Sequence, residues 1–84
     1  MRDAAEYYDQ RQPGLGDEFL DHVVRTLRLV RERPESFAEI LSDVRRASVS
    51  RFPYGIFYRA MSDRIVVLAV YHASRNPRGI DDRI

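Results

Sequence analysis

Apolar residues recur at helical spacing in the middle of the chain and stop at a proline. Four of them follow one another at intervals of four, four and three residues: Phe19, Val23, Leu27 and Val30. This spacing places one apolar stripe on a helix, and we predict an amphipathic helix over residues 15–32. Pro34 cannot continue the helix. The rest of the chain must therefore supply a partner for one apolar helix face.

A shorter helix is predicted before this one. Ala4 and Tyr8 are four residues apart, which favours a helix over residues 2–11. Pro13 and Gly14 then interrupt the pattern. Because so short a link joins two helices, we predict an antiparallel helical hairpin.

After residue 43 the apolar pattern changes to that of strands. We predict a connector over 35–42, strands over 44–51, 55–61 and 64–72, and a turn-rich tail over 73–84. The last strand has no polar face, so we expect it to be central in the sheet or buried on both sides. The predicted fold class is α+β, with an antiparallel helical hairpin packed on a small antiparallel β-sheet in the order α-α-β-β-β.

Length and composition exclude several classes of protein. A chain of 84 residues predicts a single domain, 1–84. The absence of cysteine excludes disulfides, zinc–thiolate sites and thiol nucleophiles, and the two histidines lie far apart, so we expect no metal and no cofactor. The longest apolar run, 65–71, is too short to cross a membrane, and the first residues lack an apolar signal segment. We therefore expect a cytoplasmic protein without a membrane partner.

The basic residues are unevenly distributed and are all arginines. Residues 1–42 hold six arginines and nine acidic residues, whereas residues 43–84 hold eight arginines and four acidic residues. A basic second half suits a nucleic-acid surface or a docking surface for an acidic partner. A solvated mixture of charges is the alternative, and composition alone leaves both readings open.

Several short motifs, in their order and spacing, resemble the RelE/ParE superfamily of type II toxins, and the ParE-like branch more closely. They are YY at 7–8, QPGLG at 12–16, FL at 19–20, Pro34 with Phe37, VRR at 44–46, RFPYGIFY at 51–58 and VLAVYHASRNP at 67–77. Two features depart from the family pattern. The family opens with a β-strand, which is absent here, and it often carries a tryptophan where this chain has Ile80. A misassigned start, a truncated gene and a strand supplied by a partner would each account for the first departure.

The resemblance implies the toxin of a type II toxin–antitoxin module, of the kind linked to plasmid stabilisation. A ParE-like toxin is expected to inhibit growth by binding DNA gyrase without chemistry of its own. A cognate antitoxin that binds the helices and the open sheet edge is expected to neutralise it. Pairing of open edges could also give a homodimer.

Two other functions remain open. A RelE-like endonuclease would cut mRNA on the ribosome, with His72 as the base and Arg46, Arg51 and Arg75 on the phosphate. No aromatic residue follows Arg75 to stack on a base, which argues against this activity. A truncated, inactive relative is the third reading.

The candidate target- or partner-binding residues are arginines of the strands and of the segment that follows them, because arginine is a frequent interface anchor. They are Arg45, Arg46, Arg51, Arg59, Arg75 and Arg83.

Overall fold

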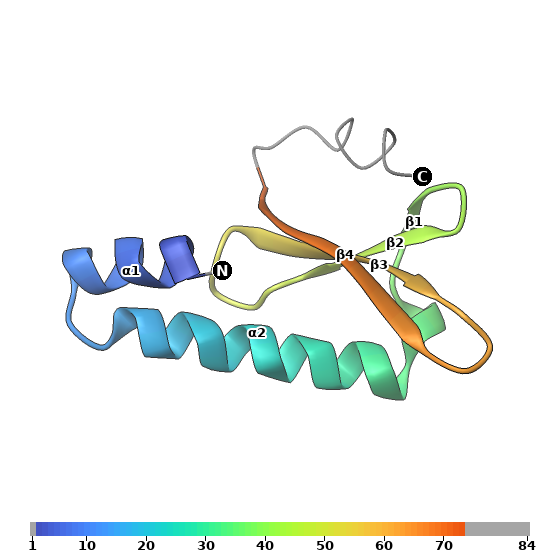
Figure 1. The fold of residues 1–84 in the computed structure, drawn as a ribbon, viewed down its shortest axis with the longest axis horizontal. Coiled ribbons are helices and arrows are strands. Elements are labelled where there is room, and N and C mark those ends of the chain that lie inside the picture. Colours follow the sequence, from blue (N-terminus) through green and yellow to red (C-terminus); the bar gives the residue numbers. More distant parts are fainter. Residues whose placement is uncertain (1, 74–84) are drawn as a thin grey trace.

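The computed structural model describes residues 2–73, which form a helical hairpin followed by a β-sheet (Figure 1). This arrangement confirms the predicted α+β fold. The helices lie on one side of the sheet, and a short 3-10 helix, η1, leads into it. The elements are α1 (Arg2–Arg11), α2 (Leu15–Glu32), η1 (Pro34–Ser36), β1 (Glu39–Leu41), β2 (Val44–Ser48), β3 (Tyr54–Ala60) and β4 (Ile65–His72).

The helical hairpin depends on two glycines, one in the turn between α1 and α2 and one in the first turn of α2. Gly14 has φ 88°, a left-handed conformation that glycine adopts without strain. Gly16 allows the two helices to approach closely, because a Cβ atom there would collide with the carbonyl oxygen of Ala5. The amide of Gly16 donates a hydrogen bond of 2.8 Å to Oδ1 of Asp9, which joins the two helices. The bounds of both helices are those that the sequence predicts.

Within residues 2–73 the strands form an antiparallel sheet in the order β1-β2-β3-β4. The sequence prediction was incomplete here, because β1 lies inside the segment that was predicted as a connector. β2 also ends at Ser48 instead of Arg51, since the chain leaves the sheet in a turn around Ser50 and Arg51.

The main core lies between α2 and the inner face of the sheet. Its fully or almost fully buried side chains come from α2, β2 and β3. Burying a valine, isoleucine or phenylalanine side chain stabilises a fold by about 2 kcal/mol. We call this the helix-side core, and it includes Phe19, Val23, Val30, Ala47, Ile56 and Tyr58.

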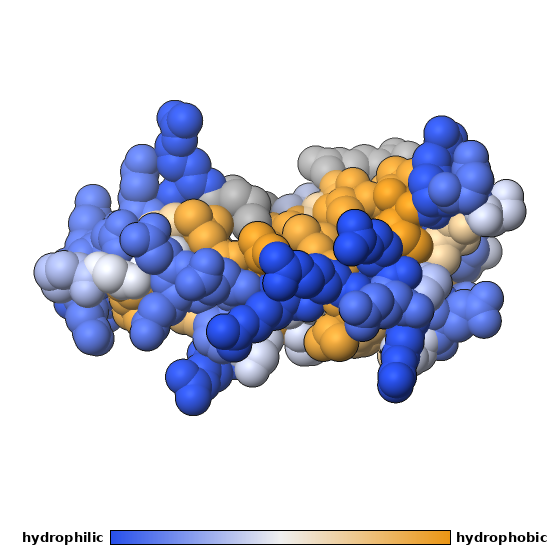
Figure 2. Space-filling model, turned by 90° about the horizontal axis from the view of Figure 1, so that it is seen from below, coloured by the Kyte–Doolittle hydropathy of each residue, from blue (hydrophilic) through white to orange (hydrophobic). Residues whose placement is uncertain are grey.

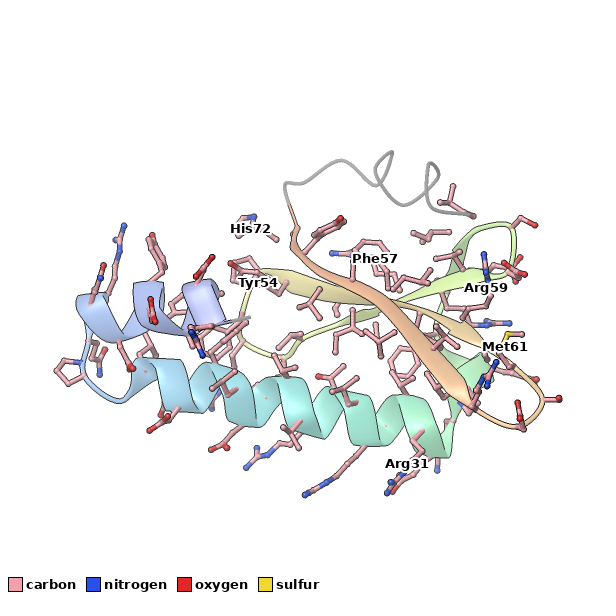
Figure 3. All side chains as sticks on the ribbon, in the orientation of Figure 1. Arg31, Tyr54, Phe57, Arg59, Met61 and His72 are labelled. Atoms are coloured by element: carbon pink, nitrogen blue, oxygen red, sulfur yellow. The ribbon has the colours of Figure 1, made fainter. Side chains whose placement is uncertain are left out.

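A second cluster lies on the sheet face that points away from the helices. Val44 and Phe57 are its buried members, and Leu41, Leu68, Ala69 and Tyr71 pack against them. Figure 3 shows Phe57 on this side of the sheet, opposite α2. The sheet is thus apolar on both faces.

The last strand is not central in the sheet, contrary to one of the two expected alternatives, and its two faces are only partly buried. β4 is the final strand of the sheet order, and Val67 on it is 46 % exposed. The register between β3 and β4 shifts at Leu68, because Phe57 pairs with Ala69 whereas Tyr58 pairs with Val67. The bulge places the consecutive residues Leu68 and Ala69 on the same face, in the second cluster, whereas Val70 packs on the helix-side core. β4 thus contributes apolar residues to both clusters without being central.

No helix among residues 2–73 combines the length and the hydropathy that a membrane span requires.

Candidate partner-binding surfaces

Arg45 serves mainly to hold the connector against the sheet. Its Nη1 atom donates hydrogen bonds to the carbonyl oxygens of Phe37, at 2.6 Å, and Glu35, at 3.3 Å. Its Nη2 atom lies 3.9 Å from Oε1 of Glu39. The hydroxyl of Tyr58 donates a further hydrogen bond of 2.6 Å to the carbonyl oxygen of Pro34. Together these bonds fix η1 and β1 beside β2 and β3.

Arg46 and Arg59 have contacts within the fold as well. The guanidinium of Arg46 lies 5.9 Å from the ring centre of Phe57, and its side chain runs so close to Gly55 that a Cβ atom there would meet Nε of Arg46 at 2.5 Å. Nε of Arg59 lies 3.0 Å from Oδ1 of Asp43 in an exposed ion pair, which contributes little stability.

Arg51 occupies a different part of the molecule, in the turn between β2 and β3. Its φ angle is 69°, which is unusual for a residue other than glycine. It lines a polar hollow of about 480 Å³ together with residues of α2. Because the hollow contains carboxylates as well as guanidinium groups, it carries no strong charge of one sign. Its other lining residues are Glu18, Asp21, His22, Arg25 and Ser50.

His72 lies at the end of β4, beside the rings of α1. Its imidazole stacks edge-on against Tyr54, with ring centres 5.3 Å apart, and the two lie together in Figure 3. Tyr7, Tyr8 and Pro53 complete a hollow of about 420 Å³ around them. Burial raises the pKa of Tyr8, and the neighbouring phenols of Tyr54 and Tyr7 add to this.

The proposed nuclease residues therefore lie in separate surroundings. His72 is beside Tyr54, Arg46 is beside Phe57 on the far face of the sheet, and Arg51 is beside α2. Arg75 and Arg83 lie outside the described residues. Within residues 2–73, no group of histidines and carboxylates is arranged to hold a metal ion.

A groove that the sequence did not reveal runs between the C-terminal end of α2 and the hairpin of β3 and β4. Its volume is about 500 Å³ and its lining is mostly apolar. Figure 2 shows apolar surface exposed on this side of the molecule, and Figure 3 places Arg31 and Met61 at the same end. The exposed charged residues at the groove are Arg31, Asp63 and Arg64, and the apolar ones are Leu27, Val30, Pro34, Met61, Ile65 and Val67.

We call this the α2–β4 groove. The apolar stripe of α2 indicated part of this groove in the sequence, since Leu27 and Val30 belong to the stripe. The rest depends on where the hairpin lies relative to the helix, which spacing along the chain does not determine.

The family described as "ParE toxin of type II toxin-antitoxin system, parDE" matches residues 1–77. No significant match was found among curated proteins or among solved structures. The family match spans both helices and all the strands described above, and it agrees with the motifs of the helical hairpin, the connector and the strands. The chain belongs to the ParE toxin family of type II toxin–antitoxin systems.

Proposed function

We propose that this toxin inhibits DNA gyrase in the cytoplasm by non-covalent binding and that a cognate antitoxin neutralises it. The observation that carries the proposal is the match to the ParE branch over residues 1–77. Members of this branch are expected to act as binding proteins, so the target would be recognised through surface contacts.

The placement of the candidate catalytic residues supports a binding mechanism over RNA cleavage. Cleavage by a ribose hydroxyl needs a base and positive charge around one phosphate group. His72 packs on Tyr54, whereas Arg46 lies along Gly55 and Phe57 on the other face of the sheet. A single phosphate would not be served by both from these positions.

The α2–β4 groove supports the second part of the proposal. The apolar groove is lined by two guanidinium groups, of Arg31 and Arg64, against one carboxylate, of Asp63. This excess of positive charge suits a segment that carries both apolar and acidic side chains. Ile65 and Val67 bring the outer strand of the described sheet to the same groove, so such a segment would contact a helix and the sheet edge together.

Inducible expression in a bacterial host tests the gyrase proposal when DNA supercoiling and translation are followed separately. We expect growth to stop with loss of supercoiling while translation continues at first. His72→Ala should leave the growth arrest unchanged, because no chemical step is assigned to the imidazole.

Two outcomes would contradict the proposal. Early arrest of translation that His72→Ala abolishes would establish the nuclease mechanism instead. Unimpaired growth despite verified expression of the folded chain would establish an inactive relative.

A further inference from the structure

The outer side of α2 carries a regular stripe of exposed residues. They recur at alternating intervals of four and three residues, which keeps them on one face of a helix. This face is opposite the one that carries Phe19, Val23, Thr26 and Val30 into the core. We call it the α2 outer stripe, and its members are Asp17, Asp21, Val24, Arg28 and Arg31.

The middle of the stripe is apolar and accessible. Val24 is 46 % exposed, and it lines a hollow of about 300 Å³ with Leu27, Arg28 and Arg31. α2 lies at the outer edge of the molecule in Figure 1, and Figure 2, which views that side, shows apolar surface among hydrophilic side chains. Another helix could therefore approach without displacing any described element.

The charges of the stripe are sorted by sign. Both acidic residues precede Val24 and both arginines follow it. The helix dipole favours this order in the first and last turns, but it acts on every face of the helix. Beside the stripe, Glu18, Arg25 and Glu32 follow one another with alternating signs. The dipole therefore does not account for sorting along one face.

The four charges have no ion-pair partner in the part of the chain that the structure describes. The ion pairs among residues 2–73 are Arg45 with Glu39 and Arg59 with Asp43. The stripe is thus available to a partner with the complementary order of charges.

We propose that this partner is a second copy of the chain, packed through α2 in antiparallel orientation about Val24. A two-fold axis there brings Asp17 opposite the partner's Arg31 and Asp21 opposite the partner's Arg28, with the two Val24 side chains in the centre. A parallel pair would place like charges opposite each other. The alternating spacing suits two helices that cross at a shallow angle, as in an antiparallel coiled coil.

The contact is small, which sets the expected affinity. α2 has 18 residues and is about 27 Å long, so a single helix pair forms an interface of the weak, transient class. We expect a dissociation constant on the order of 10 μM that rises with salt concentration. Dimerisation does not depend on the identity of the toxin's target.

Charge reversal gives a sharp test by sedimentation equilibrium of the purified chain. Asp17→Arg with Asp21→Arg makes the stripe entirely basic, and Arg28→Asp with Arg31→Asp makes it entirely acidic. Each double variant alone should dimerise at least about tenfold more weakly than the wild type, because like charges then face each other. An equimolar mixture of the two should form a heterodimer, which also shows that both variants are folded.

Matched controls come from the same helix. Glu18→Arg with Arg25→Glu reverses two exposed charges beside the stripe and should leave the dissociation constant unchanged. Val24→Ser should weaken the dimer, whereas Leu29→Ser, at a side chain that is 52 % exposed on another face, should not. A wild type that remains monomeric at concentrations well above the expected constant overturns the proposal. So does a dimer that survives both charge reversals, since it would use another surface such as the β4 edge.

Discussion

At the scale of single residues, Tyr58 connects the helix-side core to the segment that follows α2. Its side chain has no exposed surface, and its hydroxyl donates to the carbonyl oxygen of Pro34. Burial raises its pKa above the usual 10.0, and the charge of Arg45 opposes this in part. The protonated phenol is therefore favoured more strongly in the folded chain than in the unfolded chain.

This shift predicts a loss of stability at alkaline pH. The contribution of Tyr58 is fully present below pH 10.0 and falls as the pH rises through the folded-state value, because the unfolded chain ionises first. Tyr58→Phe should lower the free energy of unfolding by about 1 kcal/mol at neutral pH. In the variant, this free energy should also fall less steeply as the pH rises into the alkaline range. Urea unfolding followed by circular dichroism on both sides of pH 10.0 measures both effects. A Tyr58→Phe variant whose unfolding free energy falls with alkaline pH as steeply as that of the wild type would refute this account. Tyr7→Phe is the control, and because the ring of Tyr7 is 49 % exposed, it should change the free energy of unfolding little at neutral pH.

At the scale of elements, the helical hairpin depends on contact between two backbones. Gly16 of α2 lies against the carbonyl oxygen of Ala5 in α1, and an added Cβ atom would also lie 2.8 Å from the carboxylate of Asp9. The backbone of α1 cannot move away without losing the bond between the Gly16 amide and Asp9.

Gly16→Ala should therefore destabilise the fold. We expect a loss of about 2 kcal/mol in the free energy of unfolding, measured in urea, because the added methyl group forces the helices apart. At an open helical position the same change would stabilise by about 1 kcal/mol, so the sign of the effect is diagnostic. Gln10→Ala, at an exposed position of α1, serves as the control and should change stability by less than half a kilocalorie per mole. A Gly16→Ala chain more stable than the wild type would show that α1 is not packed as described.

The sequence predicted the helices better than the strands, for physical reasons. The period of Phe19, Val23 and Val30, together with Pro34, fixed both the face and the end of α2. β1 has only three residues, which are too few to show an alternating pattern in the sequence. The segment is a strand because it forms hydrogen bonds with β2. The apolar run of β4 indicated apolar contacts on both faces, and the strand is partly buried against one apolar cluster on each side of the sheet. A central position did not follow, since burial of the faces leaves the backbone edge undetermined.

The candidate site was harder to predict than the fold. Arg45 and Arg46 are consecutive in β2, so their side chains lie on opposite faces of the sheet. This alternation could not indicate that Arg45 would bond to the connector or that Arg59 would pair with Asp43. The assignment of these arginines to a target or partner remains a prediction. The α2–β4 groove arises from elements far apart in the sequence and appears only once the chain is folded.

At the scale of the whole molecule, we predict that substitutions in the α2–β4 groove separate neutralisation by the antitoxin from toxicity. Met61→Glu with Arg64→Glu places negative charge where an acidic, apolar antitoxin segment is proposed to bind. We expect the double variant to bind the antitoxin at least about tenfold more weakly and to escape neutralisation on co-expression. Calorimetric titration measures the affinity, and Arg2→Glu on α1 is the control. Equal affinity of the variant and the wild type would place the antitoxin elsewhere.

The bulge at Leu68 has a consequence for how this family can change in length. Between the pairs Phe57–Ala69 and Tyr58–Val67, β4 has one residue more than β3. Deleting Leu68 would make Val67 and Ala69 consecutive opposite two consecutive residues of β3, so simple alternation would return with Val70 still in the helix-side core and Tyr71 still on the other face. A relative that lacks this residue can therefore keep the same side chains over the last part of the strand. Length is thus expected to vary at this position during evolution without a matching change in residue type.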